Sequence, residues 1–273
     1  KNFNNLFQIA NTKSEIINNI ISGGTIVLNK DDNFFNFFKK KALKKKLKVI
    51  SFSKKINADV KHIKTVKKKT KYILSLLIGK KVKKLIVKDK IISYLDNILA
   101  AVATISHVAG FKKIKKDLFY DFNLPAGRGD FIKIKIKNKK INIIDESYNS
   151  NPLSLKFAIN RFDRMRINKK NRVILLGDML ELGKLSTKLH KDAIKTINKS
   201  KINKVFVYGK YINKAFNKIK PQKKGKILKN KNEILELFQN GLKNNDYLMV
   251  KGSNATGLNK MFSKNNLIRL NAI

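Results

Sequence analysis

The sequence predicts an α/β fold in two parts, the second of them Rossmann-like, with a mostly parallel, doubly wound sheet. Short apolar runs at residues 173–176, 204–208 and 247–250 have the length of buried strands, and each is followed within two residues by glycine. Helical patterns separate these runs, and strands that alternate with helices at this spacing form parallel sheets. The length of 273 residues allows two moderate hydrophobic cores.

The chain is strongly basic, with 62 Lys and Arg residues against 18 Asp and Glu residues and a formal net charge of +44. Such a charge is typical of proteins that bind nucleic acid or an anionic membrane surface. Here nearly all of it is lysine, scattered through every segment together with Asn and Ile, and no nucleic-acid-binding motif accompanies it. We therefore expect no nucleic-acid partner, and we interpret the lysines as a solvated surface that attracts anionic substrates.

The sequence contains no cysteine, which excludes disulfides and cysteine-based metal sites. It has no apolar run of the roughly 18 residues that a membrane span requires, and no signal-peptide pattern opens it. The expectation is a cytoplasmic protein without a membrane partner.

The first half of the chain is interpreted mainly as scaffold. Its patterns predict, in order, a helix, a strand after a Gly-Gly break, a second buried strand, a β-hairpin and a long helix, at residues 6–21, 25–28, 48–53, 72–87 and 96–109. The long helix is apolar nearly all round and is followed by Gly110, so we expect it to be buried. His107, near its end, has no second ligand at helical spacing and is interpreted as a packed or partly exposed histidine.

We place a domain boundary after Leu124, which divides the chain into residues 1–124 and 125–273. Beyond it, Ile alternates with Lys over residues 132–136, a pattern typical of a hairpin with one buried face. The returning strand ends in Asp-Glu-Ser-Tyr-Asn-Ser-Asn-Pro. Within this stretch Asn151 suits a helix N-cap, and Pro152 suits the first helical position. The sequence therefore predicts a strand-turn-helix junction here.

Polar residues follow the later strands at their carboxyl ends, which is the edge where open α/β sheets bind ligands. Asp178 and Glu181 could orient an amine nucleophile or a metal-bound water. The alternative is that they cap a helix. Lys251 and Ser253 flank Gly252, and a lysine, a glycine and a hydroxyl at a strand end favour an anion or carboxylate pocket.

Two further side chains are candidates for the same region. Arg128 lies between Gly127 and Gly129, whose backbone freedom lets a guanidinium reach a phosphate across an interdomain cleft; the plain alternative is a turn arginine. His190 falls on the packed side of the helix predicted from Ser186 onward. General base, substrate contact and domain packing all stay open as its role.

Four motifs occur in order along the second half: LPAGRG at 124–129, IIDESYNSNP at 143–152, LLGDMLELG at 175–183 and VKGSN at 250–254. Together they resemble the Mur ligase family. The resemblance implies that residues 1–124 are the C-terminal part of the family's central ATP-binding domain, a truncated ATPase-type domain. Residues 125–273 would then be the Rossmann-like C-terminal domain.

The resemblance implies an ATP-dependent amide ligase, that is, an acid–amino-acid ligase or peptide synthase. DESYNSNP and GDMLELG resemble the branch of the family that adds D-alanyl-D-alanine to UDP-N-acetylmuramoyl-tripeptide, through an acyl phosphate, in peptidoglycan precursor synthesis. ATP and Mg²⁺ are the implied cofactors, and a cytoplasmic monomer is the expected form.

The resemblance also implies roles for individual residues. Lys13 falls on a carbamylated lysine, and a carbamate is an oxygen ligand suited to Mg²⁺; the alternative is an ordinary surface lysine. Lys13 and His190 are the implied catalytic residues. Five positions are implied to bind ATP, namely Asn97, Arg128, Asp145, Tyr148 and Asn149. Four others are implied to bind the amine substrate, namely Asp178, Glu181, Lys251 and Ser253. Upstream of Asn97, residues 91–94 depart from the family's usual Gly-x-His-Asn run.

No G-x-x-x-x-G-K-[ST] sequence occurs in the chain, so the loop that cradles ATP phosphates in this family is not among these residues. We therefore interpret the chain as the C-terminal portion of a longer ligase and expect it to be inactive alone. Two other classes stay open, a basic nucleic-acid-associated protein and a non-catalytic nucleotide-binding remnant. The ligase interpretation predicts that Arg128, Tyr148, Asp178 and Lys251 converge on one rim that faces a pocket beside Lys13.

Overall fold

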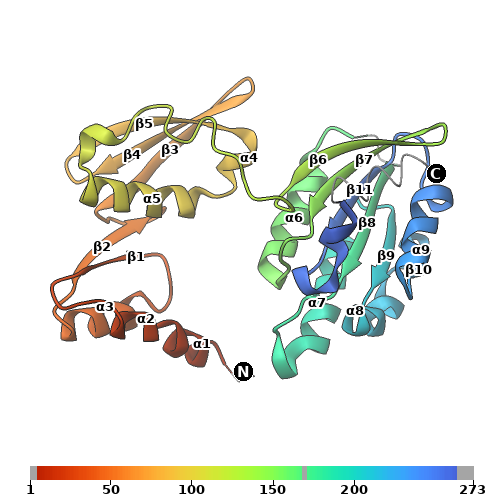
Figure 1. Cartoon of the computed structure of the whole chain (residues 1–273), viewed down its shortest axis with the longest axis horizontal. Coiled ribbons are helices and arrows are strands. Elements are labelled where there is room, and N and C mark those ends of the chain that lie inside the picture. The colour runs from red at the N-terminus through yellow and green to blue at the C-terminus, as the bar shows by residue number, and fades with distance from the viewer. Residues whose placement is uncertain (1–4, 168–170, 263–273) are drawn as a thin grey trace. The chain divides into compact units, whose positions relative to one another are not determined.

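A computed structural model describes residues 5–167 and 171–262 of the chain (Figure 1). The chain divides into two compact units, Asn5–Leu124 and the part that begins at Pro125, and each unit is described by itself. Both are mixed α/β structures, as the sequence predicts. Among the described residues, no helix has both the length and the apolar character that crossing a bilayer would require.

The N-terminal unit is built on a five-stranded sheet with the order β1-β2-β3-β4-β5. β1, β2 and β3 run parallel, and β3, β4 and β5 are antiparallel neighbours. The strands span Thr25–Asn29, Lys48–Ser53, Val60–Lys68, Lys71–Ile78 and Lys81–Lys88. The predicted hairpin corresponds to β4 and β5. The sequence analysis missed β3 because most of its residues are exposed and lysine-rich, so no apolar run marks it.

Helices cover this sheet unevenly. They span Leu6–Lys13 (α1), Glu15–Asn18 (α2), Phe35–Lys44 (α3), Asp89–Ile92 (α4) and Leu95–Val108 (α5), and a 3-10 turn follows at Phe111–Lys113. The single helix predicted over residues 6–21 is wrong, because the helix breaks at Ser14, whose hydroxyl donates to the carbonyl of Asn11. α5 lies close to its predicted position, but the expectation of burial all round is wrong. It packs one face on the sheet, and Val108 is 77% exposed.

The β1 side of the N-terminal unit is open. Among the described strands β1 pairs only with β2, and all five of its residues are half-buried. The helices and loops near it carry exposed apolar side chains, namely Leu6, Phe7, Ile16, Ile21 and Leu43. The small cluster beneath them consists of Ile17, Ala42 and Leu47, with partly buried neighbours. An unpaired sheet edge beside uncovered apolar residues is a surface that ordinarily receives further structure.

The C-terminal unit has a six-stranded sheet with the order β10-β9-β8-β11-β7-β6. All neighbours are parallel except β6 and β7, which form the predicted hairpin. The strands span Asp130–Ile136 (β6), Lys139–Glu146 (β7), Arg172–Gly177 (β8), Lys204–Tyr208 (β9), Lys224–Ile227 (β10) and Tyr247–Lys251 (β11). The prediction of a Rossmann-like, mostly parallel sheet is confirmed.

Helices cover both faces of this second sheet, which makes it doubly wound. One face packs against α6 (Pro152–Arg164), α7 (Ser186–Lys199) and α8 (Lys210–Ala215). The other packs against α9 (Lys231–Glu236) and two later helical turns, Leu237–Gly241 and Leu258–Phe262. Shorter 3-10 turns lie at Gly183–Leu185, Phe216–Lys218, Pro221–Lys223 and Asn254–Thr256. The central strands β8 and β11 are almost fully buried between the two layers, so the core is closed on both sides there.

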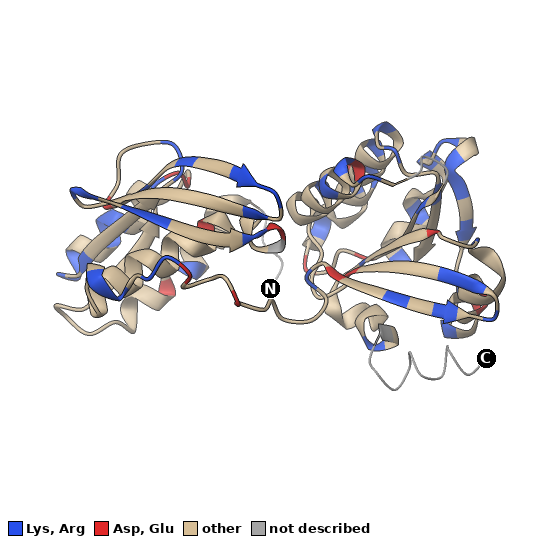
Figure 2. Ribbon diagram, turned by 90° about the horizontal axis from the view of Figure 1, so that it is seen from above, with Lys and Arg blue, Asp and Glu red and all other residues tan. Residues whose placement is uncertain are grey.

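Lysine and arginine residues are distributed over strands, helices and loops in both units (Figure 2). Acidic residues are sparse and lie between them (Figure 2). The lysines thus do not gather on a single element, which agrees with their interpretation as a solvated surface.

Candidate functional site

The strongest candidate site lies at the carboxyl edge of the C-terminal sheet. The strand order places the ends of β7, β11, β8 and β9 side by side. Lys251 at the end of β11 pairs with Glu146 on one side and with Leu176 on the other, and Gly177 pairs with Tyr208. Residues that are up to about a hundred positions apart in the sequence therefore become neighbours, because parallel strands end on a common edge.

The turn after β7 is held from inside the unit. Asp145 accepts hydrogen bonds from the backbone N–H of Ser147, at 3.0 Å, and from the Ser147 hydroxyl. The ammonium of Lys251 donates to the backbone oxygens of Glu146, at 3.2 Å, and of Asn149. Asn151 then caps α6 in a capping box with Ser154, and Pro152 is the first helical residue, as predicted. The polar turn is thus rigidly attached to the strand end.

The loop that carries Arg128 is docked onto this turn. The backbone N–H of Tyr148 donates to the backbone oxygen of Gly127 at 3.1 Å. The backbone N–H of Gly129 donates to the backbone oxygen of Asp145 at 2.7 Å. Gly127 has φ +77°, and a Cβ there would lie 2.9 Å from the Tyr148 nitrogen. Glycine is required at this position because it tolerates both the left-handed backbone and the close approach.

Docking of this loop places the Arg128 guanidinium over the Tyr148 ring, 4.5 Å from its centroid. The Tyr148 ring is 41% exposed. The Nε atom of Arg128 is buried and has no hydrogen-bond partner among the described residues. A guanidinium stacked on an aromatic ring is oriented in advance, and its free N–H groups suit a phosphate or carboxylate.

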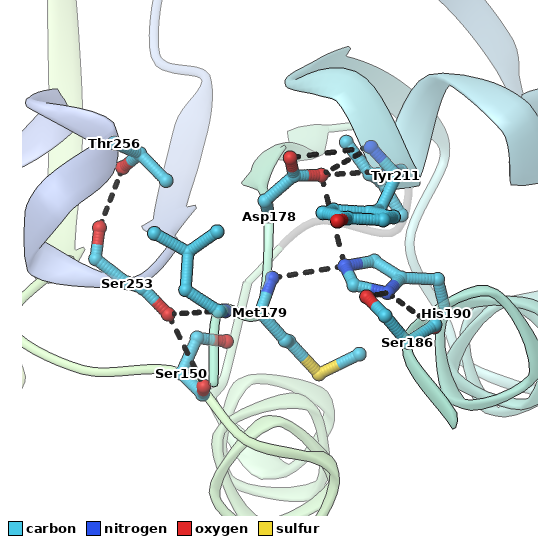
Figure 3. A network of polar contacts seen from close by, with 10 residues as sticks. Ser150, Asp178, Met179, Ser186, His190, Tyr211, Ser253 and Thr256 are labelled. Carbon is cyan, nitrogen blue, oxygen red and sulfur yellow. Dashed lines mark hydrogen bonds and ion pairs between the residues drawn. The ribbon is translucent and has the colours of Figure 1, made fainter. Parts of the chain in front are cut away.

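The second cluster lies after β8 and is centred on Asp178 (Figure 3). Its carboxylate accepts hydrogen bonds from the backbone N–H groups of Tyr211, at 3.0 and 3.2 Å, and Ile212, at 2.7 Å. These are among the first N–H groups of α8, which lack partners inside the helix. Asp178 therefore joins the end of β8 to the start of α8, which corresponds to the helix-capping alternative left open by the sequence.

His190 supports the same turn from beneath (Figure 3). Its Nε2 atom accepts the N–H of Met179 at 2.9 Å. Its Nδ1 atom lies 2.7 Å from the backbone oxygen of Ser186, to which it donates. Nε2 also lies 3.7 Å from the Asp178 carboxylate. The side chain is fully buried, so both ring nitrogens are occupied within the fold.

Ser253 links the two clusters. Its hydroxyl accepts the N–H of Leu180 at 2.9 Å and donates to the backbone oxygen of Ser150 at 3.4 Å. Its backbone N–H donates to the backbone oxygen of Asp178 at 2.9 Å. The Thr256 hydroxyl donates to the Ser253 oxygen at 2.6 Å (Figure 3). The Ser150 hydroxyl is buried and unpartnered within the part of the chain that the structure describes. Hydrogen bonds therefore join the turn after β7, the turn after β8 and the start of α8 in one polar network.

A pocket of about 380 Å³ opens beside this network. Its lining includes Asp178, Gly209, Lys210, Lys229 and Thr256. Asn213 also lines it, and the Oδ1 atom of Asn213 is buried without a hydrogen-bond partner among the described residues. A larger pocket, of about 710 Å³, lies at the opposite edge of the sheet, where the strands begin. The smaller pocket is therefore the one that shares an edge with the polar network.

Burial shapes the charges at this edge. It lowers the pKa of Lys251 to about 8, although the carboxylate of Glu146 opposes this shift. Burial also raises the pKa of Glu146, opposed by Arg161 and Lys251, and raises the pKa of Asp145, opposed by its hydrogen bonds from Ser147. The unfavourable burial of each charge is thus partly compensated by a neighbour of opposite charge or by hydrogen bonds.

The structure brings the predicted residues of this unit to one edge but changes what several of them can offer. Lys251, predicted to face an anion, is 1% exposed and holds two backbone oxygens instead. Asp145 and His190 are likewise buried, with Asp145 Oδ1 bonded to Ser147 and both ring nitrogens of His190 bonded within the fold. Arg128 keeps a free N–H, and Tyr148, Asn149 and Glu181 are exposed.

The sequence analysis gave no role to Ser150 or Asn213. Both carry a buried oxygen without a partner among the described residues, which makes them candidates for ligand contact. Ser150 lies inside the DESYNSNP motif, so its position was a usable signal. Nothing in the sequence distinguishes Asn213 from the other asparagines, because its setting depends on how α8 meets the pocket.

Lys13 and Asn97 belong to the N-terminal unit. Lys13 is the last residue of α1 and is exposed, and Asn97 is exposed in the first turn of α5. The described residues contain no group of three or more His, Cys, Asp or Glu side chains that could hold a metal ion. On their own, these side chains therefore do not fit a Mg²⁺ site, and the carbamylation of Lys13 stays a prediction.

Together, the fold and this edge describe a doubly wound α/β unit with a candidate ligand site at its strand ends. Sequence profiles then match in two places: the Mur ligase middle domain over residues 1–105, and the Mur ligase glutamate ligase domain over residues 127–254. The chain belongs to the Mur ligase family and carries its middle and C-terminal domains.

Curated relatives support this assignment. The chain is 32% identical over 263 residues to the UDP-N-acetylmuramoyl-tripeptide–D-alanyl-D-alanine ligase of Buchnera aphidicola subsp. Baizongia pistaciae, covering 94% of this chain and 54% of that protein. It is 30% identical over 269 residues to the enzyme of the same name from subsp. Acyrthosiphon pisum, with 95% and 55% covered. The chain thus spans about half the length of the curated relatives it matches.

Solved structures show the same fold. MurF from Acinetobacter baumannii superposes with a TM-score of 0.74 at 21% identity, covering 95% of this chain and 55% of that one. MurF ligase from Thermotoga maritima, solved in complex with ADP, gives a TM-score of 0.71 at 18% identity, with 97% and 58% covered.

Proposed function

We propose that this chain is the C-terminal portion of an ATP-dependent amide ligase that adds D-alanyl-D-alanine to UDP-N-acetylmuramoyl-tripeptide. The names of its relatives, which match nearly the whole chain, support this substrate pair. The observation that carries the proposal furthest is the Arg128 guanidinium, stacked on Tyr148 and holding a buried, unpartnered Nε. It is a preformed anion contact at the strand edge where this fold binds ligands.

The proposed reaction proceeds in two steps. A carboxylate does not react with amines, so its oxygen first attacks the γ-phosphorus of ATP, and ADP leaves with the electrons of the broken P–O bond. The amine of the dipeptide then attacks the acyl phosphate carbon, inorganic phosphate leaves, and the amine loses a proton. Charge develops on phosphoryl and carbonyl oxygens, so fixed positive groups lower the barrier.

We assign the nucleotide contacts of this unit to its Arg128 loop and to the turn after β7. Arg128 would bind a phosphate group, and the exposed Tyr148 and Asn149 would contact the nucleotide. Asp145 and Lys251 would act indirectly, because both are buried and fix the backbone of that turn. Mg²⁺ enters the proposal only together with ATP, whose phosphates supply oxygen ligands.

We assign the amine substrate to the 380 Å³ pocket beside Asp178. The free Oδ1 atom of Asn213 is an acceptor and suits an ammonium or amide N–H. Lys210 and Lys229, which line the same pocket and are exposed, suit a carboxylate. A dipeptide carries both kinds of group. Asp178, Ser253 and His190 would hold the wall of this pocket, and Glu181 lies exposed near its turn.

The remaining parts of the proposal follow from this substrate pair. Nucleotide-linked sugar peptides are cytoplasmic, so we propose a cytoplasmic location, and we propose a monomer. For Asn97 and Lys13, in residues 1–124, we propose the nucleotide and Mg²⁺ roles that the family resemblance implies. Nucleic-acid binding is not favoured, because the positive charge is dispersed over both units (Figure 2) and the chain belongs to a ligase family.

The test fuses this chain behind the upstream half of the Buchnera relative, with the relative's own second half as the positive control. We expect phosphate release that requires ATP, the tripeptide precursor and D-alanyl-D-alanine together. Arg128→Ala should lower kcat/KM by roughly 100-fold or more, as loss of a charge-stabilising donor does. The exposed Arg164→Ala is the matched control and should change it little. A folded fusion that releases no phosphate while the control is active would refute the proposal and favour a non-catalytic remnant.

A further inference from the structure

Arg161 is an arginine outside every recognised motif, yet it lies against the proposed nucleotide site. It belongs to α6, and its guanidinium is 2.6 Å from the Glu146 carboxylate at the end of β7. The pair is largely shielded from solvent, with side chains 30% and 14% exposed. Ion pairs in such a setting are held in a fixed geometry, unlike those at an open surface.

The same guanidinium fills the space beside Gly129. A Cβ built on Gly129 would lie 2.3 and 2.6 Å from the two terminal nitrogens of Arg161, and 2.9 Å from the carbon between them. Gly129 also has φ +89° and donates its N–H to the Asp145 oxygen at 2.7 Å. The backbone next to Arg128 is thus packed directly on the Arg161 side chain.

Charges of both signs surround this contact. Arg128, Arg161 and Lys251 supply three positive groups, and Asp130, Asp145 and Glu146 supply three negative ones. Removing one member would leave the others unbalanced in a partly buried site, where the cost is larger than at the surface. The loop with Arg128 therefore depends on Arg161 both for packing and for charge.

We propose that Arg161, oriented by Glu146, is a positioning residue that fixes the loop of residues 127–129 and thereby aims Arg128 and Tyr148 at the nucleotide. This inference rests on the proposed function for its ligand. Arg128 contacts the ligand in this scheme, and Arg161 acts only through the backbone of Gly129 and the carboxylate of Glu146. A long side chain such as that of Arg128 binds well only when its rotamer is held in advance.

The test compares amide hydrogen exchange and ATP affinity between the parent chain and its variants. The first three variants are Arg161→Met, Arg161→Lys and Arg164→Met, the last at an exposed arginine on the same helix. In Arg161→Met we expect the amides of Gly129 and Tyr148 to exchange about tenfold faster, while the strands β8 and β9 exchange as in the parent. ATP should bind about tenfold more weakly, because fewer molecules hold Arg128 ready.

Arg161→Lys should recover part of the loop protection and part of the ATP affinity, because lysine restores the positive charge but not the planar guanidinium. Arg164→Met should match the parent. Glu146→Gln should reproduce Arg161→Met, and the double variant should be little worse than either. Unchanged loop exchange in Arg161→Met overturns the inference. Faster exchange throughout the unit also overturns it, because the pair would then serve general stability. Local loosening in a chain whose parent form binds no ATP supports the positioning role and counts against the proposed function.

Discussion

The two units of this chain share a mixed α/β construction but differ in how completely they are closed. In the C-terminal unit both faces of the sheet are covered, and the polar residues at the strand ends are buried and mutually bonded. In the N-terminal unit the β1 edge is unpaired among the described strands, and apolar side chains lie exposed near it. A closed unit can hold a preformed site by itself, whereas an open one is expected to need further structure.

One histidine from each unit gives the sharpest test of this difference. His190→Ala should lower the free energy of unfolding of the C-terminal unit by roughly 2–4 kcal/mol, because it empties a buried space and leaves the Met179 N–H without an acceptor. His107→Ala is the counterpart in the N-terminal unit, where an exposed ring lies 3.0 Å from the Thr25 hydroxyl. It should change stability by about 0.5 kcal/mol or less. Urea unfolding, followed by amide exchange in each unit, measures both. Equal effects would remove the contrast.

Adjacent isoleucines in α2 test how much core the open unit has. Ile17 is 2% exposed and Ile16 is 63% exposed. Ile17→Ala should lower the free energy of unfolding by about 2–4 kcal/mol. Ile16→Ala should hardly change it, because alanine favours the helix and the exposed isoleucine buries little apolar surface. The measurement is the urea midpoint of the N-terminal unit. A large loss from Ile16→Ala would show that the exposed face is covered in solution.

The lysine at the closed edge should titrate unusually. In the folded chain the pKa of Lys251 is lowered to about 8, so this lysine loses its proton as the pH rises through 8. In the unfolded chain its pKa is about 10.5, so it stays protonated up to that pH. The unfolded state then binds more protons between these values, so the free energy of unfolding should rise with pH from about 8 to 10.5, by about 3 kcal/mol. Below pH 8 both states are charged and the contribution is constant. The difference between the chain and Lys251→Met isolates this slope, and a slope of opposite sign would contradict the assignment.

An exposed counterpart should show the smallest effect. Lys54 pairs with Asp96 at 2.6 Å in the N-terminal unit, but both side chains are more than a third exposed. Lys54→Met should change the free energy of unfolding by less than about 1 kcal/mol, and raising the salt concentration should shrink the difference further. A loss comparable to that of His190→Ala would mean that this pair is buried in solution.

The sequence predicted most of the C-terminal unit because local signals and tertiary structure agree there. The apolar runs that became β8 and β11 are buried on both faces, and Asn151 with Pro152 marked the start of α6. It failed at β3, most of whose residues are exposed, and at Ser14, where the helix breaks although the apolar pattern continues.

Side-chain availability was the harder part of the site to predict. Motifs identified Lys251 and His190, but only the packed structure reveals that their polar atoms are already bonded within the fold. Arg161 carried no motif signal at all. Its place beside Gly129 depends on how α6 packs against the end of β7, which no local pattern encodes.

The central claim is that residues 127–130 and 147–150 form a preformed nucleotide contact within the C-terminal unit. Backbone amide NMR during titration with ATP tests it most directly. We predict shifts concentrated in these two segments of the C-terminal unit and their loss in Arg128→Ala. Shifts confined to other parts of that unit, or the same response in Arg128→Ala, would contradict the claim.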